Sequence, residues 1–172
     1  MRLKNLAYPV LVLVLVAGSA GCNRQYLVTV NNQSVYDPRI PADLLQLTDP
    51  NLQGCVNLAL TQQNILNPSE LGVLSCASAE VADLRGIEQF RNLRFLDLAV
   101  NNISDLQPLA SLRQLSGLSI PFNPLTDISP LLGMNSLTAV ILTGNGQLSC
   151  SQLNRLEQRL GENLTRPENC QN

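Results

Sequence analysis

The sequence predicts an α/β solenoid, in which short parallel strands from successive repeats form a curved sheet with its strands on the concave face. The segment at residues 93–109 recurs at 115–131, with an offset of 22 residues at every matched position. Both copies contain L-x-x-L-x-[LI]-x-x-N, and alternating aliphatic residues are typical of a short strand with one buried face. The apolar residues are mostly aliphatic, because the chain has no Trp and only three Tyr and three Phe.

About four repeats are expected at residues 71–148. A third clear copy begins at Leu137, and a degenerate copy at 71–90 precedes the first clear one. The period and the pattern are those of leucine-rich repeats. The repeats also end in N-x-[IL]-x-D-[IL]-x-P-L, and in this they resemble the internalin-type leucine-rich repeat proteins. The resemblance implies a helical cap before the first repeat.

Residues 1–21 are predicted to be an export signal. Arg2 and Lys4 precede an apolar stretch at residues 6–16, and small residues follow it. The apolar stretch is shorter than the roughly 20 residues that a membrane-spanning helix needs. We therefore expect a cleaved signal rather than a transmembrane anchor.

The end of this segment resembles a bacterial lipobox, in which Cys22 would be diacylated and become the new N-terminus. Ser19 stands where that pattern usually has Leu. The same sorting pattern places Asp after the cysteine of proteins kept at the inner membrane. Asn23 therefore implies the outer membrane, with the periplasmic side favoured over the cell surface. The alternative is an ordinary signal peptide cut after Ala20.

Two segments are expected before the repeats. Residues 22–47 are predicted to be a tether with a possible β-hairpin, because β-forming residues flank a polar turn at 31–34. Residues 48–70 are predicted to be a helical cap, with Asp49 as the N-cap and Pro50 in the first turn.

Residues 149–172 are predicted to be a second helical cap. Leu153, Leu156 and Leu160 share one face of this helix, and Gly161 is its expected stop.

Cysteine positions predict one disulfide at each end of the repeats. If Cys22 carries lipid, four cysteines remain, and four cysteines allow three connectivities. The 22-residue register places Cys76 and Cys150 at inward positions at opposite ends of the array. The predicted pairs are therefore Cys55–Cys76 and Cys150–Cys170, each contributing about 3 kcal/mol by loop closure.

Polar residues that recur with the repeats are expected to be structural. One asparagine per repeat is expected at the same position, so that these residues form an internal ladder. Their side-chain amides would form hydrogen bonds with backbone groups of the turning loop; the residues are Asn101, Asn123 and Asn145. The row of Asp83, Asp105 and Asp127 raises the possibility of calcium. Single, widely spaced carboxylates support local turns more simply, because a calcium site needs clustered oxygens.

No catalytic residue, metal site or cofactor is expected. The chain has no His, so a Ser-His-Asp or Cys-His arrangement cannot form. The formal net charge of −2 includes no basic run, which argues against nucleic acid as a partner. The expected contact surface is the concave face, and its candidate residues are Phe95, Asp97, Ser119, Ile141 and Thr143.

We therefore expect a monomeric, non-catalytic, protein-binding leucine-rich repeat lipoprotein of the bacterial envelope. Its partner would be an envelope or extracellular protein, and its N-terminal lipid would hold it on the membrane. One alternative is a structural or envelope-maintenance lipoprotein whose repeats act as a spacer. Another is a surface adhesin for host protein or polysaccharide, since adhesion is the known role of internalins.

Overall fold

The computed structural model describes residues 28–30, 33–36 and 47–170. The predicted export signal, Cys22 and Asn23 lie outside the described residues. Most of the predicted tether lies outside them as well.

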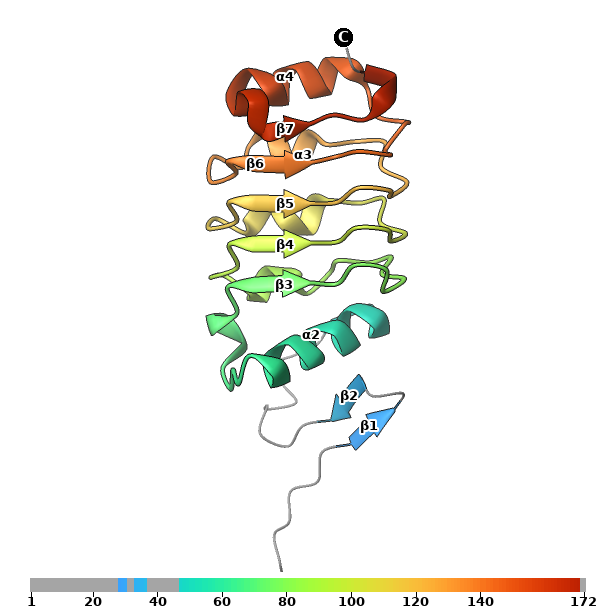
Figure 1. Ribbon diagram of the computed structural model, residues 1–172. Helices are drawn as coiled ribbons and strands as arrows, with labels where there is room; N and C mark the ends of the chain where they lie inside the picture. Colours follow the sequence, from blue (N-terminus) through green and yellow to red (C-terminus); the bar gives the residue numbers. More distant parts are fainter. Residues whose placement is uncertain (1–27, 31–32, 37–46, 171–172) are drawn as a thin grey trace, which may run out of the picture.

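Five short parallel strands form the main sheet in chain order (Figure 1). They are β3 (Val73–Ser75), β4 (Phe95–Asp97), β5 (Gly117–Ser119), β6 (Ala139–Ile141) and β7 (Leu164–Thr165). From β3 to β6 the paired residues are 22 apart in sequence, as Val73 with Phe95 and Phe95 with Gly117. The predicted fold class, a leucine-rich repeat solenoid with a parallel sheet, is confirmed.

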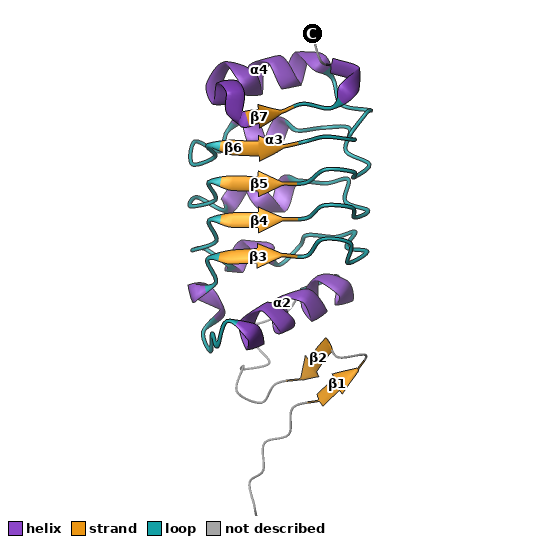
Figure 2. Cartoon of the chain, viewed as in Figure 1, coloured by secondary structure: helices purple, strands orange, loops and turns teal. Residues whose placement is uncertain are grey.

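Short helical segments lie behind the sheet and return the chain to the next strand (Figure 2). They are η3 (Ile87–Gln89), η4 (Gln107–Ser111) and α3 (Ser129–Leu132). Pro108 and Pro130 lie in the first turn of the last two, where a missing N–H costs nothing.

Two longer helices lie at the ends of the sheet. The helix α2 (Pro50–Gln62) lies beside β3 and leads through η2 (Pro68–Glu70) into the first repeat. The helix α4 (Cys150–Leu160) lies beyond β6, at the other end. Arg159 of α4 donates to the carbonyls of Leu131 and Met134, at 3.0 and 2.6 Å, and so joins α4 to the last repeat.

The strand β7 was not predicted. After α4, the chain passes through η5 (Gly161–Asn163) and adds Leu164 beside Val140 before ending in η6 (Glu168–Cys170). This pairing is offset by 24 residues rather than 22, because α4 is longer than the returning segments of the repeats. The 22-residue repeat period therefore does not predict this strand.

A separate antiparallel ribbon precedes the solenoid, at the place where the sequence predicts a hairpin. It consists of β1 (Val28–Val30) and β2 (Gln33–Tyr36), and β2 lies beside α2.

The core is a stack of aliphatic side chains between the sheet and the returning segments. The inward residues of successive strands, Leu74, Leu96, Leu118 and Val140, are at most 2% exposed. Burying one such side chain contributes about 1.5–3 kcal/mol. Phe90 is the one aromatic side chain in this core, as far as the described residues go. Over the same residues, no helix is both long and apolar enough to cross a membrane.

Candidate binding surface

The outward side of β3 to β6 forms a shallow apolar hollow. Three large apolar side chains face solvent there: Val73, Phe95 and Ile141 are 51%, 54% and 41% exposed. The polar groups among its lining residues come from Ser75, Asp97 and Ser119. Alternation along each strand explains this surface, since Leu points inward and the residues on either side point outward.

Four of the five predicted contact residues line this hollow together, namely Phe95, Asp97, Ser119 and Ile141. Thr143 does not line it. Thr143 follows the end of β6, where its carbonyl accepts a hydrogen bond from the N–H of Phe122 at 2.9 Å. The strands are three residues long, so the hollow ends before this position.

Asp97 is the one charged residue among the described residues that line the hollow. Its Oδ2 accepts a hydrogen bond from Oγ of Ser75 at 3.0 Å, across the strands β3 and β4. Its Oδ1 accepts from the backbone N–H of Ala99 at 3.2 Å. Both donors are neutral, so the negative charge remains in a largely apolar surface.

Two exposed apolar residues just after the strands were not predicted from the sequence. Val100 and Phe122 are 53% and 57% exposed, and each has a positive φ, of 57° and 55°. The equivalent residues in the neighbouring repeats are Ser78 and Gly144, which also have positive φ. A left-handed backbone before each ladder position turns these side chains outward. Val and Phe rarely adopt a positive φ, so their presence in the sequence does not indicate this conformation. Gly144, at the equivalent position of the next repeat, is consistent with it.

The three ladder asparagines connect neighbouring repeats. Nδ2 of Asn123 donates to the carbonyl of Leu98 at 3.0 Å, and its Oδ1 accepts from the N–H of Ile103 at 3.0 Å. Asn101 and Asn145 make the equivalent bonds to the carbonyls of Cys76 and Ile120, at 2.8 and 3.0 Å. These side-chain amides form hydrogen bonds with backbone groups of the repeats, so they stabilise the fold rather than form a ligand-binding site.

The recurring aspartates each support a local turn. The Oδ1 atoms of Asp83, Asp105 and Asp127 accept from the backbone N–H two residues later, at 2.8–2.9 Å. The bonds from Arg85 lower the pKa of Asp83, and those from Ser129 lower the pKa of Asp127. Among the described residues, no cluster of His, Cys, Asp or Glu is suited to a metal ion.

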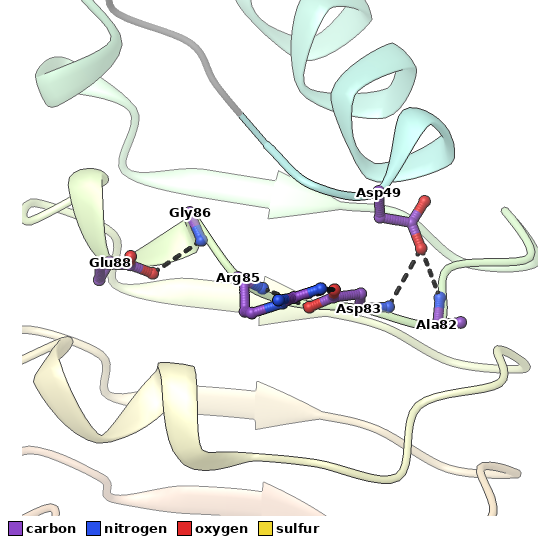
Figure 3. A network of polar contacts seen from close by, with 6 residues as sticks. All are labelled: Asp49, Ala82, Asp83, Arg85, Gly86 and Glu88. Carbon is purple, nitrogen blue, oxygen red and sulfur yellow. Dashed lines mark hydrogen bonds and ion pairs between the residues drawn. The ribbon is translucent and has the colours of Figure 1, made fainter.

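Asp49 joins α2 to the loop of the first repeat. Its Oδ1 accepts from the N–H of Asn51 and Leu52, as predicted for an N-cap. Its Oδ2 accepts from the N–H of Ala82 and Asp83 at 2.8 and 3.0 Å (Figure 3). Burial raises the pKa of Asp49, but the four backbone donors outweigh it and hold the pKa below the ordinary value.

Two disulfides lie at the two ends of the solenoid. They join Cys55 to Cys76 and Cys150 to Cys170, the pairs that the repeat register selects. Cys76 is buried, as expected, but Cys150 is exposed, which corrects its predicted inward position. In the repeats, the equivalent residue precedes the returning helix. Here the N-cap is Ser149, so Cys150 is already helical and its side chain is turned outward.

Comparison with known proteins supports the leucine-rich repeat fold. A family model described as leucine-rich repeats, in two copies, matches residues 91–132. Internalin C2 of Listeria monocytogenes is similar, with 30% identity, a TM-score of 0.53 and coverage of 59% of this chain and 47% of that one. An internalin (inlF) of the same organism has 28% identity, a TM-score of 0.63 and coverage of 77% and 40%.

The chain therefore spans less than half the length of either internalin. No curated protein matches it. The solenoid is like that of the internalins, and this kind of fold is typical of proteins that bind other proteins rather than of enzymes.

Proposed function

We propose that this protein is a non-catalytic leucine-rich repeat lipoprotein of the bacterial envelope, and that it binds another protein through its concave face. The observation that carries the proposal is the hollow over β3 to β6. Val73, Phe95 and Ile141 expose large apolar side chains on one continuous surface. Contiguous exposed apolar surface commonly marks an interaction site.

Packing does not account for these exposed side chains. The inward residues Leu74, Leu96 and Leu118 already fill the core, and Phe95 lies on the opposite side of the sheet from them. Covering the exposed part of Phe95 with a partner would contribute about 25 cal/mol to the free energy of binding for each Å² of apolar surface buried. A partner is therefore the simplest reason for an aromatic residue at this position.

The cysteine count supports the lipid anchor. Two disulfides use four of the five cysteines, which leaves Cys22 without an intramolecular partner among them. A cysteine at the end of an export signal has a use as a lipid-bearing N-terminus. Mass spectrometry of the mature N-terminal peptide tests this: the expected mass is that of a diacylated Cys22, and an unmodified thiol would rule out the anchor.

The contact surface is tested by crosslinking in envelope extracts. Wild-type protein is expected to capture a partner that Phe95→Ala loses. The matched control is Leu66→Ala, which removes a similarly exposed apolar side chain that does not line the hollow. If Phe95→Ala captures the same proteins as wild type, the concave face is not the contact surface and the repeats act as a spacer.

The position in the envelope separates the periplasmic role from adhesion. We propose the outer membrane, because Asn23 rather than Asp follows the cysteine. Protease added to intact cells is expected to leave the protein whole while cleaving it in opened cells. Cleavage in intact cells would instead favour the adhesin.

A further inference from the structure

We infer that the partner presents a cationic side chain next to an aliphatic one, with the cation on Asp97 and the aliphatic group against Phe95. This inference rests on the proposed function, because it names the chemistry of the partner for the same surface. Asp97 supplies the single carboxylate among the described residues of the hollow, and a cationic group in the partner would complement its charge.

The carboxylate of Asp97 has unused acceptor capacity. A carboxylate can accept about four hydrogen bonds. From the described residues Asp97 accepts two, from Oγ of Ser75 and the N–H of Ala99, at 3.0 and 3.2 Å. Both bonds come from the chain's own surface, so they hold the carboxylate in place and leave the remaining acceptor positions for a ligand.

Among the described residues, no cationic side chain forms an ion pair with Asp97. In residues 47–170, the ion pairs join Arg85 to Asp83 and Arg166 to Glu157, and neither involves Asp97. In the second of these pairs, Glu157 of α4 lies 2.6 Å from Arg166. Asp97, unlike Asp83 and Glu157, is left without a basic partner in the part of the chain that the structure describes.

The surroundings of Asp97 make an unpaired charge costly once a partner covers it. Phe95 precedes it on β4, Ile141 lies two strands away in the same row, and the hollow around them is largely apolar. A neutral apolar partner would strip water from the carboxylate without replacing it, which is unfavourable. Arg or Lys in the partner removes that penalty, and Arg can also form two parallel hydrogen bonds.

The experiment uses the purified full chain in detergent and a phage library of random short peptides. Peptides selected on wild-type protein are expected to share Arg or Lys beside Leu, Ile or Val. Synthetic peptides with blocked ends are then titrated against four proteins: wild type, Asp97→Asn, Asp97→Glu and Phe95→Ala.

We expect Asp97→Asn to weaken binding about tenfold, the effect of losing one charge-assisted hydrogen bond. Asp97→Glu keeps the charge and should recover part of that loss, and added salt should weaken wild-type binding more than binding to Asp97→Asn. Glu162→Gln is the matched control, since Glu162 is an exposed acid in η5 outside the hollow. It should change the affinity less than about twofold.

Several outcomes would overturn the inference. These are selected peptides without a cation, equal affinity for wild type and Asp97→Asn, or no selection at all on wild type. Self-association of wild type that Phe95→Ala abolishes would assign the hollow to a second copy instead. If Phe95→Ala loses binding but Asp97→Asn does not, the concave face remains the contact surface, and the inference that the partner places a cation on Asp97 is wrong.

Discussion

The ring of Phe95 lies across Gly117 on the neighbouring strand. A Cβ built on Gly117 would lie 2.7 Å from Cδ1 and 3.2 Å from Cε1 of Phe95. The absence of a side chain at residue 117 therefore allows the ring to lie low over β5. The two residues are a register pair, so this arrangement is part of the sheet itself.

Gly117→Ala is expected to displace the Phe95 ring without unfolding the protein. The ring can rotate away, and alanine in a strand lowers the entropy of the unfolded chain, so the free energy of unfolding should change by less than about 1 kcal/mol. Aromatic NMR signals are the direct measurement, because the chain has only three Phe and three Tyr.

Gly133→Ala is the control for this substitution, since a Cβ on Gly133 would meet nothing within 4 Å. The Phe95 signals should move in Gly117→Ala and stay in place in Gly133→Ala. Capture of the partner should fall in the first variant only. Unmoved Phe95 signals in Gly117→Ala would show that the ring does not depend on this glycine.

Removing either disulfide should lower the stability of one end of the solenoid. The two pairs are separated by 21 and 20 residues, and closing such loops contributes about 3 kcal/mol each. Replacing both cysteines of the Cys55–Cys76 pair by Ala should cost more than the same change at Cys150–Cys170. Each pair has one buried cysteine, Cys76 at 2% and Cys170 at 4% exposure, so the difference comes from their partners. Cys55 is partly buried against the core and its replacement also removes packing, whereas Cys150 is exposed.

Urea unfolding of the two double variants measures this difference. Peptide mapping without reductant should find Cys55 linked to Cys76 and Cys150 to Cys170. Cross-linked peptides that join one end of the solenoid to the other, or four free thiols, would contradict the pairing.

The regular part of the fold was predictable because its signals are local. A strand of period two and a repeat of 22 residues place Leu96 inward and Phe95 outward without any knowledge of distant contacts. The same register brought Cys76 beside α2. It failed at Cys150 and at Leu164, where a longer helix replaces the short returning segment and changes the spacing.

The missed features of the surface depend on backbone geometry or on distant contacts. Val100 and Phe122 are exposed because their φ is positive, and β-branched or aromatic residues are poor indicators of that conformation. Asp49 was predicted as a helix cap, but its bonds to Ala82 and Asp83 cross 33 and 34 residues. A single sequence holds no local sign of such a contact.

Asn123→Ala should destabilise the solenoid more than a surface asparagine would. The amide satisfies the N–H of Ile103 and the carbonyl of Leu98, and leaving a buried backbone group without a partner costs about 1–3 kcal/mol. We expect a loss of about 2–4 kcal/mol in the free energy of unfolding, measured in urea. Asn102→Ala is the matched control because Asn102 is exposed. An equal loss in the free energy of unfolding in the two variants would show that the ladder hydrogen bonds of Asn123 do not stabilise the solenoid.

Stability at acid pH should depend on Asp49. The pKa of Asp49 is held below its ordinary value of 3.8 in the folded protein, chiefly because four backbone N–H groups outweigh the effect of burial. A carboxylate with a lowered folded pKa stabilises the native state fully above its unfolded pKa. That contribution is lost as the pH falls from about 4 through the folded pKa.

Asp49→Asn removes the titrating group. At neutral pH its free energy of unfolding should be lower than that of wild type by about 1–2 kcal/mol, since the amide caps α2 less completely and offers one acceptor oxygen instead of two. As the pH falls below about 4, the gap should narrow, because wild type loses the carboxylate contribution and the variant has none to lose. Urea unfolding of both proteins between neutral pH and about pH 2.5 measures the gap. A gap that stays constant across this range would mean that the ionised form of Asp49 is not what ties α2 to the first repeat.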